Sequence, residues 1–312
     1  MANINPSSHL NPNSGFGVQA NQVGERFINK DGSVNLKKTG LPAWKTKSVY
    51  SYMQSIHWAK FLLIIVTFYF CFNVLFTIGY VIIGVDQLDG FEDKNFLHNV
   101  EECFYFSTQT FTTVGYGRIN PHGMGANILA SFETMIGWLF FALVTGLFYG
   151  RATRPRAFLA FSQNAVFAPY RGGKGLMMRV VPFKDNHHLT NAKAVVNLSL
   201  LNTEKQEYEF YSLNLERSRI DSFTMNWTIV HPIDEESPFL NLSPEDLEAA
   251  DIEIFVQITG FDPVFSNTVL ARTSYTYKEI VQNAKFVPMY HTSEDGKTTI
   301  LDLDKLNEFV LV

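Results

Sequence analysis

The chain has 312 residues and a net charge of −5, with 46% hydrophobic but only 18% charged residues. Ordinary soluble domains carry about 25% charged residues, so this composition favours a protein with a large apolar surface. The negative net charge argues against a nucleic-acid partner, and two cysteines are too few for a disulfide framework or a multi-cysteine metal site. The polar residues 1–17 lack the layout of a signal peptide and are expected to form a disordered leader.

Two apolar runs predict membrane-spanning helices. Residues 61–83 contain no formal charge, and at ~1.5 Å per residue a helix of this length exceeds the ~30 Å of membrane hydrocarbon. Residues 125–150 form the second run, in which Glu133 is the only charged residue. A buried core helix is the alternative for the first run, and its length argues against that. Two spans return the chain to the side on which it started.

Basic residues lie outside the two runs, and mostly acidic residues lie between them. The basic residues are Lys30, Lys37, Lys38, Lys45, Lys47 and Lys60 before the first run, and Arg151, Arg154 and Arg156 after the second. Because positively charged flanks stay in the cytoplasm, both termini are predicted to be cytoplasmic and the intervening loop external. Residues 44–56 mix aromatics with lysines, which favours an amphipathic helix along the membrane surface over an ordinary solvated helix.

The second half of the chain has a different pattern, which predicts a cytoplasmic β-domain. From about residue 165, short β-rich runs such as 175–183 and 251–261 alternate with turn signals. The turns include Arg171-Gly172-Gly173 and Glu294-Asp295-Gly296. Short strands at this spacing are typical of an all-β sandwich.

Residues 113–117 read TVGYG and lie between the two apolar runs. Irregular backbone at membrane depth is tolerated only where it is buried in protein or lines an aqueous path. Gly115 and Gly117 alternate with Val114 and Tyr116, and glycine adopts backbone conformations closed to other residues. Such a segment can aim successive carbonyls at one axis, where they replace the hydration shell of a cation. These five residues match the sequence of a known potassium filter.

The residues before the filter have the length of a short helix. Residues 98–111 would descend from the external side, with the partly negative C-terminal helix end directed towards a cation. The order is therefore span, half-helix, filter, span. In this setting TVGYG resembles the filter of potassium channels, which implies a homotetramer around one pore, K⁺ as the only bound metal, and no cofactor.

Three further segments narrow the resemblance. Residues 26–36, 150–181 and 229–263 resemble the prokaryotic inward-rectifier potassium channel family, and only two spans are present, without a voltage sensor. The family implies a bacterial inner-membrane protein whose cytoplasmic domain is an immunoglobulin-like sandwich. The expected organisation is an N-terminal segment 1–43, a slide helix 44–56, an outer helix 57–84, turret, pore helix and filter 85–123, an inner helix 124–151, a linker 152–164 and the sandwich 165–312.

Matching the family residue by residue assigns expected roles. The filter is Thr113, Val114, Gly115, Tyr116 and Gly117; the pore-lining and gate positions are Phe141, Thr145, Tyr149 and Phe261; and the inner-helix hinges are Gly137 and Gly146. An anionic-lipid or phosphoinositide site is expected at Lys60, Arg151, Arg154 and Arg156. Glu133 is costly in a span and functional by default; it either faces the cavity or braces the filter, and bracing is favoured.

Two departures from the family pattern affect the expected behaviour. Gln109 stands where the family has Glu, four residues before the filter threonine, which leaves the filter without that carboxylate and Arg118 without its usual partner. The alternative is that the Gln109 amide forms a hydrogen bond in its place. The positions of the acidic rings read Asn191, Leu215, Arg219 and Thr259, and Phe141 is also uncharged. Block by internal Mg²⁺ or polyamines is therefore expected to be weak.

Other functional classes were weighed against a passive channel. A potassium transporter subunit with a borrowed pore loop is one, although such proteins usually repeat the span–loop–span unit four times in one chain. A membrane-anchored sensor with a vestigial pore is the other. No Ser-His-Asp or Cys-His grouping stands out, so an enzyme is not expected.

Overall fold

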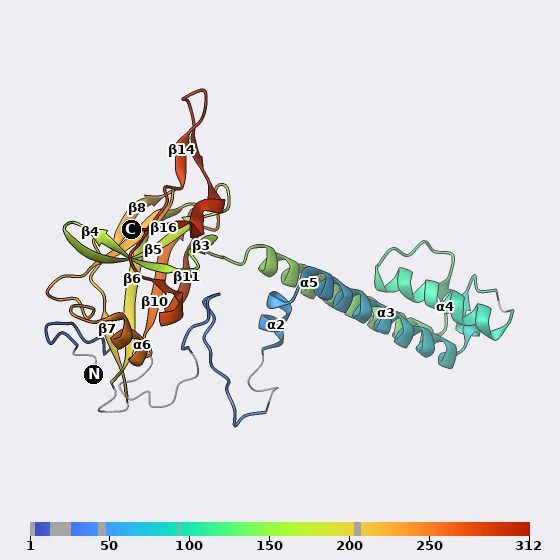
Figure 1. Ribbon diagram of the computed structural model, residues 1–312. Helices are drawn as coiled ribbons and strands as arrows, with labels where there is room; N and C mark the ends of the chain where they lie inside the picture. The colour runs from blue at the N-terminus through green and yellow to red at the C-terminus, as the bar shows by residue number, and fades with distance from the viewer. Residues whose placement is uncertain (1–3, 13–25, 43–47, 93, 203–206) are drawn as a thin grey trace. The chain divides into compact units, whose positions relative to one another are not determined.

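The structure is a computed structural model that describes residues 4–12, 26–42, 48–92, 94–202 and 207–312 (Figure 1). Two units divide the chain between them. The helical unit is Lys38–Arg154, and the β unit combines Met1–Lys37 with Pro155–Val312. The first holds the two apolar runs, and the second holds the short β-rich runs.

The helical unit is built on two long apolar helices. They are α3 (Trp58–Ile83) and α5 (Met124–Ala152), and both are long and apolar enough to cross a membrane. Their bounds lie within a residue of the two expected spans. Gly84 ends α3, because its φ of 109° is a conformation that favours glycine.

A shorter helix packs against both spans. This is α4 (Phe96–Phe111), which begins at Asn95, whose side chain accepts a hydrogen bond from the amide of His98. Its buried face carries Phe106 and Phe111, which pack with Phe76 and Tyr80 of α3. The apolar side of α4 therefore faces the spans, and Figure 1 shows α4 beside them.

The connections in this unit are short. A 3₁₀ turn (Val85–Gln87) precedes the small pair β1 (Leu88–Asp89) and β2 (Asn120–Pro121). The backbone carbonyl of Gln87 accepts from the amide of His122, and its side chain accepts from Ala126 in the first turn of α5. One residue thus holds the end of α3 to the start of α5.

The helix before the first span is shorter than the sequence predicts. It is α2 (Val49–Ser55), and its N-cap Ser48 accepts a hydrogen bond from the amide of Ser51. The expected slide helix was 44–56, of which residues 44–47 lie outside the described residues. Ile56 and His57 have extended backbone and separate α2 from α3.

Two five-stranded sheets form the β unit. One has the order β11-β10-β6-β7, with β8 also on β6; the other has the order β12-β4-β5-β3, with β9 also on β5. The strands of the first are β6 (Leu189–Asn202), β7 (Glu207–Ser212), β8 (Arg219–Phe223), β10 (Glu253–Asp262) and β11 (Asn267–Thr276). Those of the second are β3 (Leu159–Phe161), β4 (Ala165–Tyr170), β5 (Gly173–Pro182), β9 (Trp227–Pro232) and β12 (Ile280–Val281). The remaining elements are α6 (Pro244–Ala249), β13 (Ala284–Phe286), β14 (Tyr290–Thr292), β15 (Thr299–Leu301), β16 (Phe309–Leu311) and the 3₁₀ turns Tyr277–Glu279 and Leu303–Asn307.

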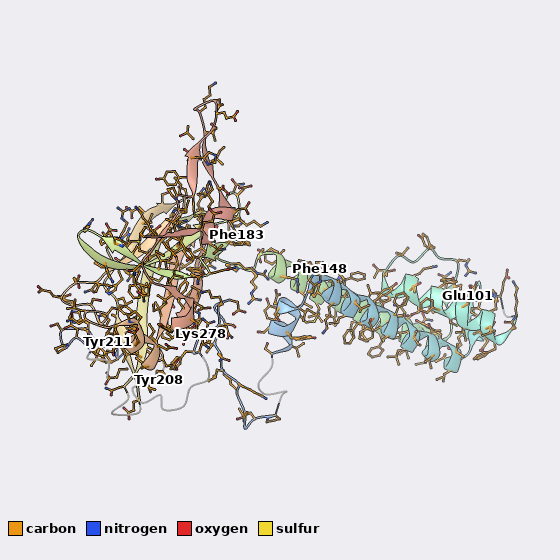
Figure 2. All side chains as sticks on the ribbon, in the orientation of Figure 1. Glu101, Phe148, Phe183, Tyr208, Tyr211 and Lys278 are labelled. Atoms are coloured by element: carbon orange, nitrogen blue, oxygen red, sulfur yellow. The ribbon has the colours of Figure 1, made fainter. Side chains whose placement is uncertain are left out.

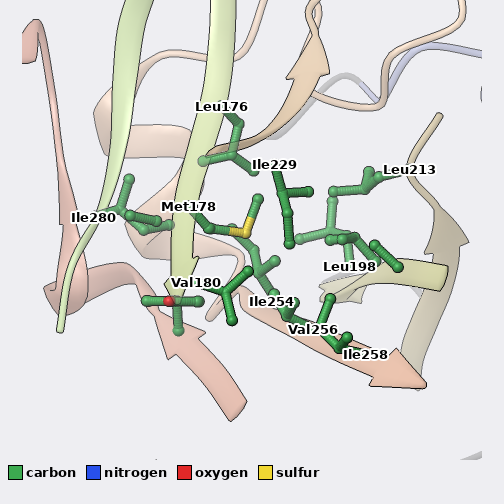
Figure 3. Close-up of a cluster of buried hydrophobic side chains, with 14 of the residues drawn as sticks. Leu176, Met178, Val180, Leu198, Leu213, Ile229, Ile254, Val256, Ile258 and Ile280 are labelled. Carbon is green, nitrogen blue, oxygen red and sulfur yellow. The ribbon is translucent and has the colours of Figure 1, made fainter. Parts of the chain in front are cut away.

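Alternating apolar residues from both sheets meet in one core. Leu176 and Met178 of β5 pack with Ile254 and Val256 of β10, and all four are fully buried (Figure 3). The period-two alternation places every second side chain of each strand on this inner face. The all-β sandwich expected from the sequence is confirmed.

The structure corrects the expected linker. Residues 152–164 were assigned to a connection, but β3 lies within them and pairs with β5, with Leu159 opposite Pro182. A three-residue strand has no measurable periodicity, so its pairing partner and not its own pattern defines it.

The N-terminal segment is also more ordered than predicted. Leu10, within the expected disordered leader, bridges to Tyr211, and Phe27 packs edge-on against Tyr208 (both tyrosines are labelled in Figure 2). The amides of Phe27 and Ile28 donate to the buried carboxylate of Glu253, at 2.6 and 3.1 Å. Burial raises the pKa of Glu253, and the amide of Phe27 opposes that shift.

Candidate ion-conducting site

The TVGYG segment begins where α4 ends. Thr112 caps the helix, and the carbonyl of Gln109 accepts hydrogen bonds from the amides of Val114 (2.9 Å) and Gly115 (3.3 Å). These two bonds fold the start of the segment back against the last turn of α4. The partly negative C-terminal end of α4 therefore lies next to residue 113.

The backbone of the segment alternates in handedness. Thr113, Gly115 and Gly117 have φ values of 56°, 52° and 79°, whereas Val114 and Tyr116 are not among the residues with positive φ. Alternation between mirror-image conformations keeps successive peptide planes in the same orientation. Successive carbonyl oxygens can then lie along one side, as a row of cation ligands requires. The two glycines are needed because positive φ is costly for residues with a side chain.

Polar contacts hold the outer end of the segment. The side-chain amide of Asn120 donates to the carbonyl of Gly117 at 2.9 Å. Arg118 pairs with Glu102 of α4, so the arginine that the Gln109 departure leaves without its usual partner has a carboxylate from elsewhere in the same subunit. No sequence pattern pointed to a role for Asn120 or Glu102. An asparagine just after a glycine-rich segment is a weak turn signal, and nothing in the sequence pairs Glu102 with Arg118.

Glu133 is fully buried behind α4. Its two carboxylate oxygens accept from the hydroxyls of Ser107 (2.5 Å) on α4 and Tyr80 (2.6 Å) on α3. Gln109, which is on α4 like Ser107, is half-buried. The sequence placed Glu133 either in the cavity or behind the filter, and the structure places it against the pore helix.

The two inner-helix glycines have different surroundings. A Cβ at Gly137 would collide with the backbone carbonyl of Phe111, so this glycine permits α5 to approach the end of α4. Gly146 has open space around the same position. The expected hinge role stays a prediction for both, and close packing is already a sufficient reason for glycine at 137.

Three expected pore-lining residues share one exposed face of α5. Phe141 and Tyr149 are 44% and 71% exposed in the single subunit, and Thr145 is exposed between them. Phe148, labelled in Figure 2, lies next to this stripe and packs on Trp58 and Phe61 of α3. Trp138 and Leu143 of α5 are also exposed in the single subunit, at 72% and 69%.

Arg151 is the half-buried member of the expected lipid ligands, although Arg154 also donates to the Gln54 carbonyl of α2 at 3.5 Å. The Arg151 guanidinium donates to the carbonyls of Met53 (2.8 Å) and Ile56, at the C-terminal end of α2. Trp58 and Phe61 flank it, with ring centres 4.5 and 5.0 Å away. Helix C-terminal carbonyls lack intrahelical partners, so Arg151 caps α2 from α5. Lys60, Arg154 and Arg156 are exposed.

The expected second constriction lies in the β unit. Phe261 is near the end of β10, opposite Thr268 of β11, and is 41% exposed. The register between β10 and β6 shifts between Thr259 and Phe261. A Cβ at Gly260 would press on Leu189 at 2.9 Å, so glycine is required for the close approach of β6 at this irregularity.

Comparison with known proteins identifies the chain. A sequence model described as the inward rectifier potassium channel C-terminal domain matches residues 159–312, and one described as an ion channel matches residues 81–154. The inward rectifier potassium channel Kirbac3.1 of Paramagnetospirillum magnetotacticum is 33% identical over 290 residues, which cover 91% of this chain and 95% of that protein. The chain belongs to the inward rectifier potassium channel family.

Eukaryotic members of the inward rectifier family match more weakly. The ATP-sensitive inward rectifier potassium channel 12 of Mus musculus and its counterpart in Homo sapiens are each 28% identical over 293 residues. The match covers 85% of this chain and 67% and 66% of those proteins. The family predicted from the sequence is confirmed, and this chain is a transmembrane channel protein and not an enzyme.

Proposed function

We propose that four copies of the chain surround one axis and conduct K⁺ passively through a filter of Thr113–Gly117 carbonyls. The observation that carries the proposal is the alternating backbone of this segment, directly after the C-terminal end of α4. Such carbonyls replace the hydration shell of K⁺, and the helix end adds a favourable partial charge. K⁺ is the transported ion and needs no other cofactor.

The exposure of the filter supports assembly into a tetramer. All five filter residues are exposed in the single subunit, and Tyr116 is 79% exposed. One subunit supplies carbonyls on only one side of an ion, so a complete ligand shell requires further copies around it. The exposed stripe of Phe141, Thr145 and Tyr149 fits the same arrangement, because it would line the cavity below the filter.

Two constrictions are proposed along the conduction path. Tyr149 near the end of α5 supplies bulk at the inner-helix crossing, and Phe261 supplies it in the cytoplasmic domain. Bulky side chains close a pore by sterics and by dewetting, without charge. The inner helices would have to splay for K⁺ to pass Tyr149.

Rectification is proposed to be weak. Phe141 faces the proposed cavity without charge, and Arg219 donates to Asn191 at 2.6 Å, so two of the expected acidic-ring positions bond to each other. Phe141→Asp should create a cation site, because pore walls of low dielectric strengthen the attraction. Voltage-dependent block by internal spermine in planar bilayers measures this. Steep micromolar block of the unmodified channel would contradict the assignment.

The protein is proposed to lie in the bacterial inner membrane with both termini in the cytoplasm. Basic residues at both cytoplasmic flanks support that orientation. The exposed Lys60, Arg154 and Arg156 are proposed to attract anionic phospholipid, at about 1 kcal/mol for each basic residue near the surface.

Ion uptake into liposomes tests the proposed function. Purified protein in liposomes should take up K⁺ and Rb⁺ but little Na⁺, and Ba²⁺ outside should block uptake. Liposomes without protein give the background, and a Gly115→Ala variant, in which positive φ is strained, should lose selective uptake. Equal uptake of Na⁺ and K⁺ by the unmodified tetramer would overturn the proposed filter.

A further inference from the structure

Four buried polar side chains from three helices form one cluster in the helical unit. They are Asn73 and Tyr80 on α3, Ser107 on α4 and Glu133 on α5, and none is more than 1% exposed. Polar groups within a span are costly unless they are hydrogen-bonded. The cluster, called the carboxylate cluster below, is therefore stable only with its bonds complete.

The bonds converge on a single carboxylate. Tyr80 donates to one oxygen of Glu133 at 2.6 Å, and Ser107 donates to the other at 2.5 Å. Ser107 also lies 3.2 Å from both the backbone carbonyl and the side-chain oxygen of Asn73. The Asn73 amide group donates to the carbonyl of Tyr69, one turn earlier in α3, which fixes the direction of its side chain.

We propose that Ser107 and Tyr80 are positioning residues, which act through Glu133 to fix the pore helix α4 between the two spans. The inference rests on the proposed filter function and extends it. Among the described residues, the structure gives Glu133 no ion-pair partner, so the two hydroxyl donors compensate its burial. The carboxylate thus links α3, α4 and α5 at one point.

The location of this link explains how it reaches the filter. Ser107 lies near the C-terminal end of α4, which ends at Phe111 just before the filter, and the next turn of α5 after Glu133 places Gly137 against the carbonyl of Phe111. The pore helix is therefore held by α5 at two successive turns, the second of them directly before the filter. A shift of α4 at Ser107 would move the Gln109 carbonyl that anchors Val114 and Gly115.

The bond pattern predicts which substitutions preserve the link. In Glu133→Gln the amide oxygen can accept from Tyr80, and its NH₂ can donate to Ser107, whose hydroxyl then donates to Asn73. In Glu133→Leu both donors lose their acceptor. Ser107→Thr keeps the hydroxyl, whereas Ser107→Ala and Tyr80→Phe each remove one donor to the carboxylate. The conservative and disruptive variants at positions 133 and 107 form matched pairs.

The ratio of Rb⁺ to Na⁺ uptake into liposomes tests the proposal. A hydrogen bond to a charged group corresponds to roughly a tenfold change in an equilibrium, so Ser107→Ala and Tyr80→Phe should lower the ratio by about tenfold. Glu133→Leu should lower it further, while Glu133→Gln and Ser107→Thr stay near the unmodified value. Ser131→Ala is the control, because among the described residues its hydroxyl bonds only to the Asn127 carbonyl of its own helix.

The outcomes separate this inference from the proposed function. If the unmodified channel is selective and Ser107→Ala and Tyr80→Phe, as intact tetramers, match Ser131→Ala, the positioning role is overturned. If the unmodified protein shows no selectivity, the proposed function fails. The link is then judged by the unfolding temperature of the tetramer, which the two disruptive variants must lower relative to Ser131→Ala. If either Ser107→Ala or Tyr80→Phe does not assemble, the other of these two variants tests the positioning role. Glu133→Gln is then compared with it as the conservative variant.

Discussion

The guanidinium of Arg151 lies 4.5 Å from the centre of the Trp58 indole ring, which sets a formal charge from the end of α5 against the start of α3. The same group donates to the carbonyl of Met53 at the end of α2. Three helices therefore meet at one cation, at the end of α5 opposite the carboxylate cluster. Arg151 and the exposed basic residues are therefore expected to contribute differently to the response to anionic lipid.

Arg151→Gln should change K⁺ flux even in neutral lipid, because α2 loses its link to α5. Arg156→Gln should instead weaken only the response to anionic lipid, since its side chain is exposed. Rb⁺ uptake in liposomes of neutral and of anionic lipid measures both effects. Wild-type flux of Arg151→Gln in neutral lipid would reduce its contacts to packing, and selectivity should stay unchanged in both variants.

Gly137→Ala should destabilise the tetramer by about 1–3 kcal/mol, the usual cost of overpacking, because the new methyl group meets the Phe111 carbonyl. Gly146→Ala is the matched control, since open space surrounds that position. If α5 bends at Gly146, this substitution should lower channel opening without lowering thermal stability, because alanine favours the helix. Thermal unfolding and single-channel recording separate the two effects. Equal stability of both variants would contradict the close approach at Gly137.

Tyr149→Ala should raise basal K⁺ flux without altering the ratio of K⁺ to Na⁺ uptake. The side chain is 71% exposed on the proposed pore face, so its removal widens the crossing and leaves the filter contacts in place. Phe148→Ala provides the contrast, because Phe148 packs on α3 and its loss should mainly lower stability. Should Tyr149→Ala keep wild-type flux as an intact tetramer, Phe261 becomes the next constriction to test.

Burial lowers the pKa of Lys30 from 10.5 to about 8, and the nearby Glu279 only partly opposes this shift. The folded β unit therefore binds fewer protons than the unfolded chain between these two values. Stability should rise as pH increases from about 8 towards 10.5. The chain releases a proton from Lys30 when it folds in this range, and a higher pH favours that release.

The Lys30→Met variant isolates this contribution of Lys30. Methionine keeps apolar contact with the Tyr275 ring, over which the Lys30 ammonium lies at 3.6 Å, but it does not titrate. The unfolding temperature of wild type minus that of Lys30→Met should therefore increase between pH 8 and pH 10. A constant difference across this window would show that Lys30 keeps its ordinary titration.

Hydropathy and one short motif were enough to predict the architecture. The uncharged run 61–83 predicted α3, which begins three residues earlier and ends at the same residue. Strand alternation predicted the sandwich. Contacts between side chains on different helices were not predictable, because a serine at 107 or a tyrosine at 80 has no periodic signal. β3 was missed for a similar reason, since only its pairing with β5 distinguishes it from a linker.

In the candidate site, too, the sequence predicted the motif but not the contacts between distant residues. TVGYG pointed to the proposed filter residues by sequence alone, but it gave no partner for Arg118 and no reason for glycine at 137. Both depend on which parts of the chain approach each other: Glu102 lies sixteen residues before Arg118, and the Phe111 carbonyl carries no side-chain signal. Docking of Phe27 was missed because one aromatic residue in a polar segment does not predict a buried one.

The bond between Glu253 and the amides of Phe27 and Ile28 restricts how the N-terminal segment can vary in evolution. A carboxylate that is bound by backbone amides does not depend on the side chains at those positions. Many residues are therefore acceptable at 28, and at 27 the aromatic contacts set the preference. Proline is the exception at both, since it has no amide hydrogen and would leave the buried carboxylate with one donor fewer. In close relatives that keep the glutamate at 253, proline should be absent from these two positions while the flanking residues change freely.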